Sequence, residues 1–139
     1  MTKKRTLAAL LMSLMVVTVL STGAAVNAAE HAFTIYAGVE SRNDKGPQFR
    51  NTGDVYNPWK VRLQITTDTQ DLITTFGLSL YDGTKQAVSG TINVKHGTGY
   101  NTKMPYSTAN YQNVILTAKD NSTSNHPTYW IAGQWAPNN

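Results

Sequence analysis

Three histidines and eight carboxylates are the side chains of this 139-residue chain that could do acid–base or metal chemistry. His31, His96 and His126 form none of the short pairs, such as H-x-H or H-x-x-x-H, that bring two imidazoles onto one metal ion. A metal site would need ligands that converge from distant segments. We therefore predict no metal site and no cofactor, and we expect the histidines to be exposed residues of turns.

A nucleophilic or hydrolytic site is not indicated either. The chain has no cysteine and no G-x-S-x-G motif, the strained turn that presents a catalytic serine. Two carboxylates could cleave a glycosidic bond if they met in space. All eight fall in predicted loops or turns or near the start of the mature chain, where capping and turn chemistry explains them. They are Glu30, Glu40, Asp44, Asp54, Asp68, Asp71, Asp82 and Asp120.

Aromatic side chains give the clearest candidate for a binding surface. Trp130 and Trp135 are five positions apart, so a regular strand sends them to opposite faces of its sheet. We expect Trp135 to point inward and Trp130 outward, where a flat ring suits a sugar or a peptide. Tyr36 and Tyr81 are the expected neighbours of Trp130 in this surface. In the alternative interpretation, Trp130 only covers threonines of an adjacent strand.

Alternating apolar and polar residues predict the elements that hold these side chains. No segment has a sustained apolar period of 3.6 residues, so little helix is expected. The sequence predicts an all-β fold, a small antiparallel β-sandwich of about six strands that forms one domain over residues 29–139. Segments 41–57 and 96–106 read as irregular, the first with a short edge pairing around Phe49. The expected strands lie near residues 32–39, 59–66, 72–80, 88–94, 114–118 and 128–135.

The segment from Trp59 to Thr66 has the strictest alternation. Val61, Leu63 and Ile65 are expected in the core. Lys60, Arg62 and Gln64 are expected on the outer face, and a solvated Arg62 should tolerate replacement by alanine with little change in stability.

The first 28 residues predict a signal peptide. Lys3, Lys4 and Arg5 precede an apolar run over residues 7–20, and small residues lead to an expected cleavage after Ala28. A helix of fourteen residues spans only about 21 Å, short of a bilayer core of about 30 Å, so an uncleaved anchor is the weaker alternative. The net charge is +4, but three of the twelve cations leave with the leader. The mature chain then has nine cations and eight carboxylates, and a net charge of about +1 argues against a nucleic-acid partner. We also expect no membrane span in the mature form.

Three groups of residues carry a resemblance to a known family. They are Asn57-Pro58-Trp59-Lys60-Val61, then Val88-Ser89-Gly90-Thr91 with Asn93-Val94-Lys95, and Tyr129 to Trp135 with Gly133. In these the chain resembles small exported proteins of Gram-positive bacteria catalogued as domain of unknown function 2712. The resemblance implies extracellular release and a compact β-domain. In size, leader and cysteine-free aromatic composition the chain is also loosely similar to a small bacteriocin family.

These observations favour a secreted, non-enzymatic protein that binds an extracellular or cell-wall ligand. A bacteriocin-like secreted toxin is the alternative, and a cryptic hydrolase is the third. A transporter encoded beside the gene would favour the toxin.

Overall fold

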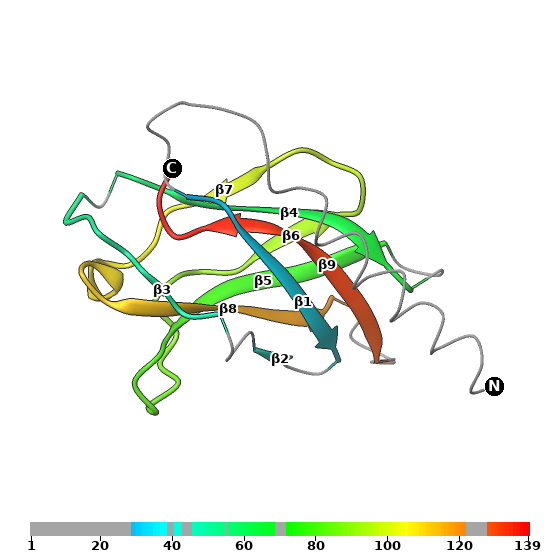
Figure 1. Ribbon diagram of the computed structural model, residues 1–139, viewed down its shortest axis with the longest axis horizontal. Helices are drawn as coiled ribbons and strands as arrows, with labels where there is room; N and C mark the ends of the chain where they lie inside the picture. The colour runs from blue at the N-terminus through cyan, green and yellow to red at the C-terminus, as the bar shows by residue number, and fades with distance from the viewer. Residues whose placement is uncertain (1–28, 39–40, 43–45, 55, 69–71, 122–127) are drawn as a thin grey trace.

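Two antiparallel β-sheets packed face to face form the protein in a computed structural model (Figure 1). The structure describes residues 29–38, 41–42, 46–54, 56–68, 72–121 and 128–139. The predicted signal peptide, Val39, Glu40, Asp44, Asp71 and His126 lie outside these residues. Sheet A has the strand order β1 (His31–Ala37), β9 (Tyr129–Ala136), β4 (Trp59–Thr66) and β7 (Asn101–Lys103). Sheet B has the order β2 (Ser41–Arg42), β8 (Asn113–Asp120), β5 (Ile73–Leu80) and β6 (Ile92–Lys95), and β3 (Gln48–Phe49) also pairs with β8.

The predicted β-sandwich is confirmed, with nine strands in the described part of the chain instead of about six. Five of the six expected strands are present over most of their length, whereas the strand expected over 88–94 is regular only as β6, Ile92–Lys95. The additional ones are the short strands β2, β3 and β7. The edge pairing expected at Phe49 is real, because Phe49 pairs with Asn113. The only helical turn among the described residues is the 3₁₀ segment Ser107–Ala109. In this part of the chain no helix is long and apolar enough to cross a membrane.

The core lies between the sheets and is rich in aromatic side chains. Phe33 of β1 meets Phe76 of β5 edge to face, with ring centroids 5.5 Å apart. The Tyr129 hydroxyl reaches the buried Thr74 hydroxyl at 3.0 Å, which satisfies both groups inside the core. Trp135 is fully buried, as its position on β9 predicts. Other buried members are Ile35, Ala37, Trp59, Val61, Leu63, Leu78, Val88, Val94, Val114, Leu116, Ala118 and Ile131.

A β-bulge in β4 corrects the expectation for Ile65. Leu63 pairs with Gly133 and Ile65 with Ala132, so one residue of β4 is left over between them. An extra residue reverses which side chains point inward beyond it. Val61 and Leu63 are in the core as predicted, whereas Ile65 is only half-buried and outside the core cluster.

A buried arginine joins three separate segments at one end of the sandwich. Arg50 is fully buried and follows β3 directly. Its guanidinium donates to the carbonyl oxygens of Pro137, of Asp54 at 3.1 Å and of Asn57 at 2.6 Å. Burial lowers the pKa of Arg50. The guanidinium is therefore held by backbone carbonyls of the loop before β4 and of the chain after β9.

Candidate functional site

Two aromatic rings lie together on the outer face of sheet A. Tyr36 and Trp130 are cross-strand partners on β1 and β9, and their ring centroids are 5.0 Å apart at an angle of 46°. The Tyr36 hydroxyl is 2.6 Å from the Thr128 hydroxyl. Tyr36 remains 44% exposed and Trp130 is half-buried. The outward orientation predicted for Trp130 is confirmed, and the pair leaves open ring surface for a ligand.

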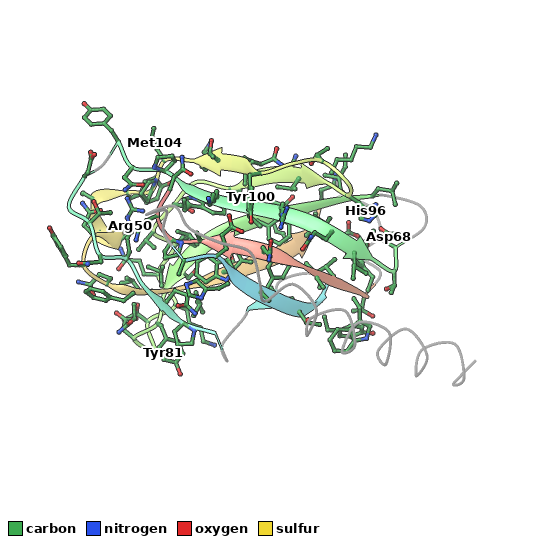
Figure 2. All side chains as sticks on the ribbon, turned by 45° about the horizontal axis from the view of Figure 1, so that its top comes forward. Arg50, Asp68, Tyr81, His96, Tyr100 and Met104 are labelled. Carbon is green, nitrogen blue, oxygen red and sulfur yellow. The ribbon has the colours of Figure 1, made fainter. Side chains whose placement is uncertain are left out.

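Tyr81 does not join this pair. Its backbone N–H donates to the carbonyl of Asn113 at 2.9 Å, at the start of β8. The carbonyl of Gly38, two residues after Tyr36, instead accepts from the N–H of Asp120 at the end of β8. Eight residues of strand separate these ends by roughly 24 Å. Tyr81 is 49% exposed, but it belongs to the opposite end of the molecule (Figure 2).

Two cations and a tyrosine ring lie farther along the same outer face. The Nζ of Lys60 and the guanidinium carbon of Arg62 each lie 4.8 Å from the centre of the Tyr100 ring. We call these three residues the Tyr100 cluster. Cations gain electrostatic attraction from the face of an aromatic ring. Tyr100 comes from the segment before β7, so β4 and a loop build the cluster together (Figure 2).

Glu30 and Gln134 complete the hydrogen bonding of the Tyr100 cluster. The Glu30 carboxylate lies 3.3 Å from the Nζ of Lys60. Arg62 donates to the side-chain oxygen of Gln134, and the same oxygen lies 3.2 Å from the Tyr100 hydroxyl oxygen. The solvated position expected for Arg62 is therefore wrong, because a ring and an amide of neighbouring segments half-bury it.

The electrostatics of the Tyr100 cluster favour a charged carboxylate beside a neutral phenol. A hydrogen bond from the Tyr100 hydroxyl, followed by the attraction of Lys60, lowers the pKa of Glu30. Burial and the adjacent Glu30 raise the pKa of Tyr100. Two cations against one carboxylate leave this end of the face with a local charge of about +1.

Sequence reasoning missed the Tyr100 cluster for a physical reason. Alternation in β4 correctly places Lys60 and Arg62 on the outer face, and Gln134 on the same face as Trp130. Tyr100, however, lies in an irregular segment where no periodicity indicates direction. The available signal was limited to the two alternating cations, because Tyr100 lies 38 positions after Arg62 in the sequence.

The described histidines and carboxylates have structural contacts. The expectation of an exposed turn residue is wrong for His31, which begins β1 and is half-buried beside Trp135, with ring centroids 6.3 Å apart. Burial lowers the pKa of His31. His96 is 2.7 Å from the carbonyl oxygen of Gln64 through Nε2. Asp82 accepts from the N–H and the hydroxyl of Thr84 in the hairpin after β5. Within the described ranges, no three potential metal ligands of the His, Cys, Asp and Glu types come together.

A model of the family described as "Protein of unknown function (DUF2712)" matches residues 20–139. This match confirms the resemblance seen in the residues around Trp59, Gly90 and Gly133. No curated protein and no solved structure matches the chain.

Proposed function

The chain belongs to the DUF2712 family, and we propose that it is a secreted, non-enzymatic protein that binds an anionic polymer of the cell envelope. Secretion is supported by the charged and apolar pattern of residues 3–28. The proposed binding surface is the outer face of sheet A. The observation that carries the proposal is that this single face holds an open aromatic pair and a cationic cluster.

The spacing of the two groups suits an extended ligand. Trp130 and Gln134 lie on the same face of β9, four residues apart, which corresponds to roughly 13 Å along the strand. Between them β9 presents Ala132, beside Thr34 of β1. Because these side chains are small, the surface between the aromatic pair and the Tyr100 cluster is not blocked by a bulky group. A polymer could stack one sugar ring on the Tyr36–Trp130 pair and place an anionic group near Arg62.

Binding without catalysis is supported by what the carboxylates do. Glu30 is held by Lys60 and Tyr100, and Asp54 and Asp82 accept hydrogen bonds from backbone N–H groups of their own loops. Each of these groups stabilises local structure. A glycosidase would instead place two carboxyl groups on either side of a cleft.

A sedimentation assay with isolated cell walls tests the proposal. The full chain is expressed with its leader, the protein is purified from the culture medium, and its first residue is determined. We expect a mature start at Ala29 and co-sedimentation with the walls. Tyr36→Ala should weaken wall binding roughly tenfold, which corresponds to a lost contact of about 1.4 kcal/mol.

Tyr81→Ala is the matched control, because Tyr81 is the same residue type with similar exposure at the far end of the molecule. It should bind walls as the parent protein does. Equal losses in both variants, or no sedimentation of the parent protein, would overturn the proposed surface. Growth inhibition of indicator cells without wall binding would favour the secreted toxin instead.

A further inference from the structure

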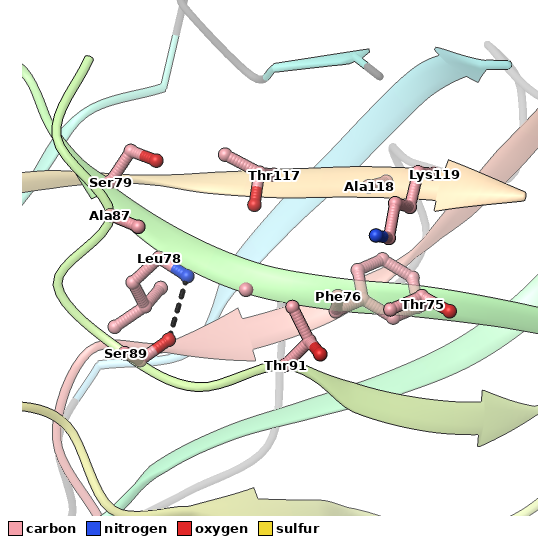
Figure 3. Close-up of a pocket in the computed structure, with 11 residues that line it drawn as sticks. Thr75, Phe76, Leu78, Ser79, Ala87, Ser89, Thr91, Thr117, Ala118 and Lys119 are labelled. Carbon is pink, nitrogen blue, oxygen red and sulfur yellow. Dashed lines mark hydrogen bonds between the residues drawn. The ribbon is translucent and has the colours of Figure 1, made fainter. Parts of the chain in front are cut away.

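A depression of about 250 Å³ lies on the outer face of sheet B (Figure 3). Its floor is β5 at Gly77, and β8 forms one wall with Thr117 and Lys119. The segment between Ala87 and Thr91 forms the other wall. We call this depression the sheet B groove. It faces away from sheet A and shares no residue with the aromatic pair or the Tyr100 cluster.

The chain builds the groove with two local devices. The first is Gly77, whose missing side chain leaves the floor low. A Cβ at this position would lie 3.1 Å from Oγ1 of Thr117 and 3.5 Å from Cγ2 of Thr91. Residues on either side of Gly77 alternate in the usual way, with Phe76 and Leu78 in the core. The groove therefore opens over a single position of a buried strand.

The second device is an irregular edge beside β5. The sequence predicts one continuous strand from Val88 to Val94, but pairing with β5 consists of the strand Ile92–Lys95 and a separate bridge between Ala87 and Ser79. Before this strand begins, the N–H of Leu78 donates to the Ser89 hydroxyl at 2.9 Å (Figure 3). The Ser89 hydroxyl in turn donates to the carbonyl of Gly90 at 2.8 Å. The Val88 N–H still donates to the Leu78 carbonyl at 2.9 Å, so the departure from regular pairing with β5 begins at Ser89, where a side chain replaces the backbone acceptor.

Several polar groups in the groove have no bond within the described part of the chain. The hydroxyls of Ser79, Thr91 and Thr117 make no hydrogen bond to a described residue, and the Lys119 ammonium makes no ion pair there. Ser79 is only 4% exposed. Thr91 is exposed and Thr117 is half-buried, so their hydroxyls can bond to a ligand or to water that enters the groove. By contrast, the Thr75 hydroxyl at the rim donates to Asn93 at 2.7 Å.

These groups define a ligand class. Hydroxyls both donate and accept, which matches the hydroxyls of a polyol, and Lys119 is the single charged residue of the lining. The volume is slightly below the roughly 300 Å³ at which pockets for drug-sized ligands begin, which suits one small unit. We propose that the sheet B groove binds a monosaccharide-sized polyol that carries one negative charge. This site is separate from the proposed function of sheet A.

The charged group could be a carboxylate or a phosphate, and NMR titrations distinguish them. The protein, produced from the full chain, is labelled with ¹⁵N and titrated with glucuronate, glucose 6-phosphate, glucose and inorganic phosphate. We expect amide shifts centred on residues 75–79, 89–91 and 117–119, and tighter binding of an anionic sugar than of glucose. The tighter of the two anionic sugars identifies the charged group.

Lys119→Gln should reduce affinity for the anionic sugar about tenfold and leave glucose binding unchanged. Lys95→Gln, on the neighbouring strand β6, removes the same charge outside the lining and should change neither. Both lysines are exposed, and dispersed amide spectra will show that the variants fold.

Three results would overturn this inference. They are equal binding of glucose and the anionic sugars, equal losses in the two lysine variants, and inorganic phosphate binding as tightly as glucose 6-phosphate. Failure of these titrations leaves wall binding by sheet A unaffected, because Tyr36 and Trp130 lie on the opposite sheet.

Discussion

Replacement of Gly133 by alanine should be among the most damaging small changes in this protein. Gly133 lies in β9 between Phe33 of β1 and Leu63 of β4, next to the bulge of β4. A Cβ added there would lie 2.0 Å from the backbone oxygen of Arg62 and 2.9 Å from Cζ of Phe33. Real Cβ atoms essentially never approach a heavy atom more closely than 3.0 Å. Strand β4 must therefore move by about an ångström.

The size of the effect follows from what that movement disturbs. Overpacking a core costs about 1–3 kcal/mol, and weakening two ladder hydrogen bonds adds about 1 kcal/mol each. The alanine restricts the unfolded chain, which offsets about 0.4–1 kcal/mol. We expect a loss of roughly 2–4 kcal/mol, which lowers the melting temperature of a domain of this size by roughly 10–20 °C.

Urea and thermal unfolding, followed by tryptophan fluorescence, measure this loss. Gly99→Ala is the control, because a Cβ at Gly99 meets nothing within 4 Å. That variant should stay within about 0.5 kcal/mol of the parent protein. A Gly133→Ala protein as stable as the Gly99→Ala control would refute the close approach of β9 to β4.

The two tryptophans of β9 should behave oppositely: Trp135→Ala should cost about 3–5 kcal/mol in urea unfolding, and Trp130→Ala less than about 1.5 kcal/mol. The reverse order would place the strand one residue out of register. Arg62→Ala should cost about 1–2 kcal/mol through the lost ring contact and the lost bond to Gln134, and a change under 0.5 kcal/mol would restore the solvated interpretation. For His31, burial lowers the folded-state pKa below 6.5, so the folded protein binds fewer protons than the unfolded chain. Stability should fall as pH drops below about 6.5, and His31→Phe should remove this part of the pH dependence in melting curves. An unchanged pH profile would contradict the burial of His31.

Much of the fold was predictable because one face of each strand is buried. A period of two in β1, β4 and β9 fixes the inward side chains, so Phe33, Leu63 and Trp135 were correctly assigned from the sequence. The bulge in β4 was not predictable, because the apolar–polar alternation of the sequence continues through it. Only the pairing of β4 with β9 reveals the extra residue. Ile65 was misassigned for that reason.

The candidate site was predictable only where it lies on regular strands. Tyr36 and Trp130 could be placed on the outer face of sheet A, but which exposed tyrosine joins Trp130 depends on strand order, which alternation does not determine. Tyr81 was grouped with them because it also alternates outward. Tyr100 and the irregular edge around Ser89 lie where the chain has no period, so the contacts they make depend on tertiary packing.

The central place of β9 in sheet A determines when the chain can fold. Among the strands that the structure describes, β9 comes last in the sequence, yet it is the one that pairs with β1 in sheet A, and it lies between β1 and β4. The hydroxyls of Tyr36 and Thr128, which meet there, are 92 positions apart. At about 5–20 residues per second, a growing chain therefore spends several seconds without the means to close its core. Until β9 has been synthesised, β1 and β4 lack the strand that joins them, so sheet A cannot cover the core.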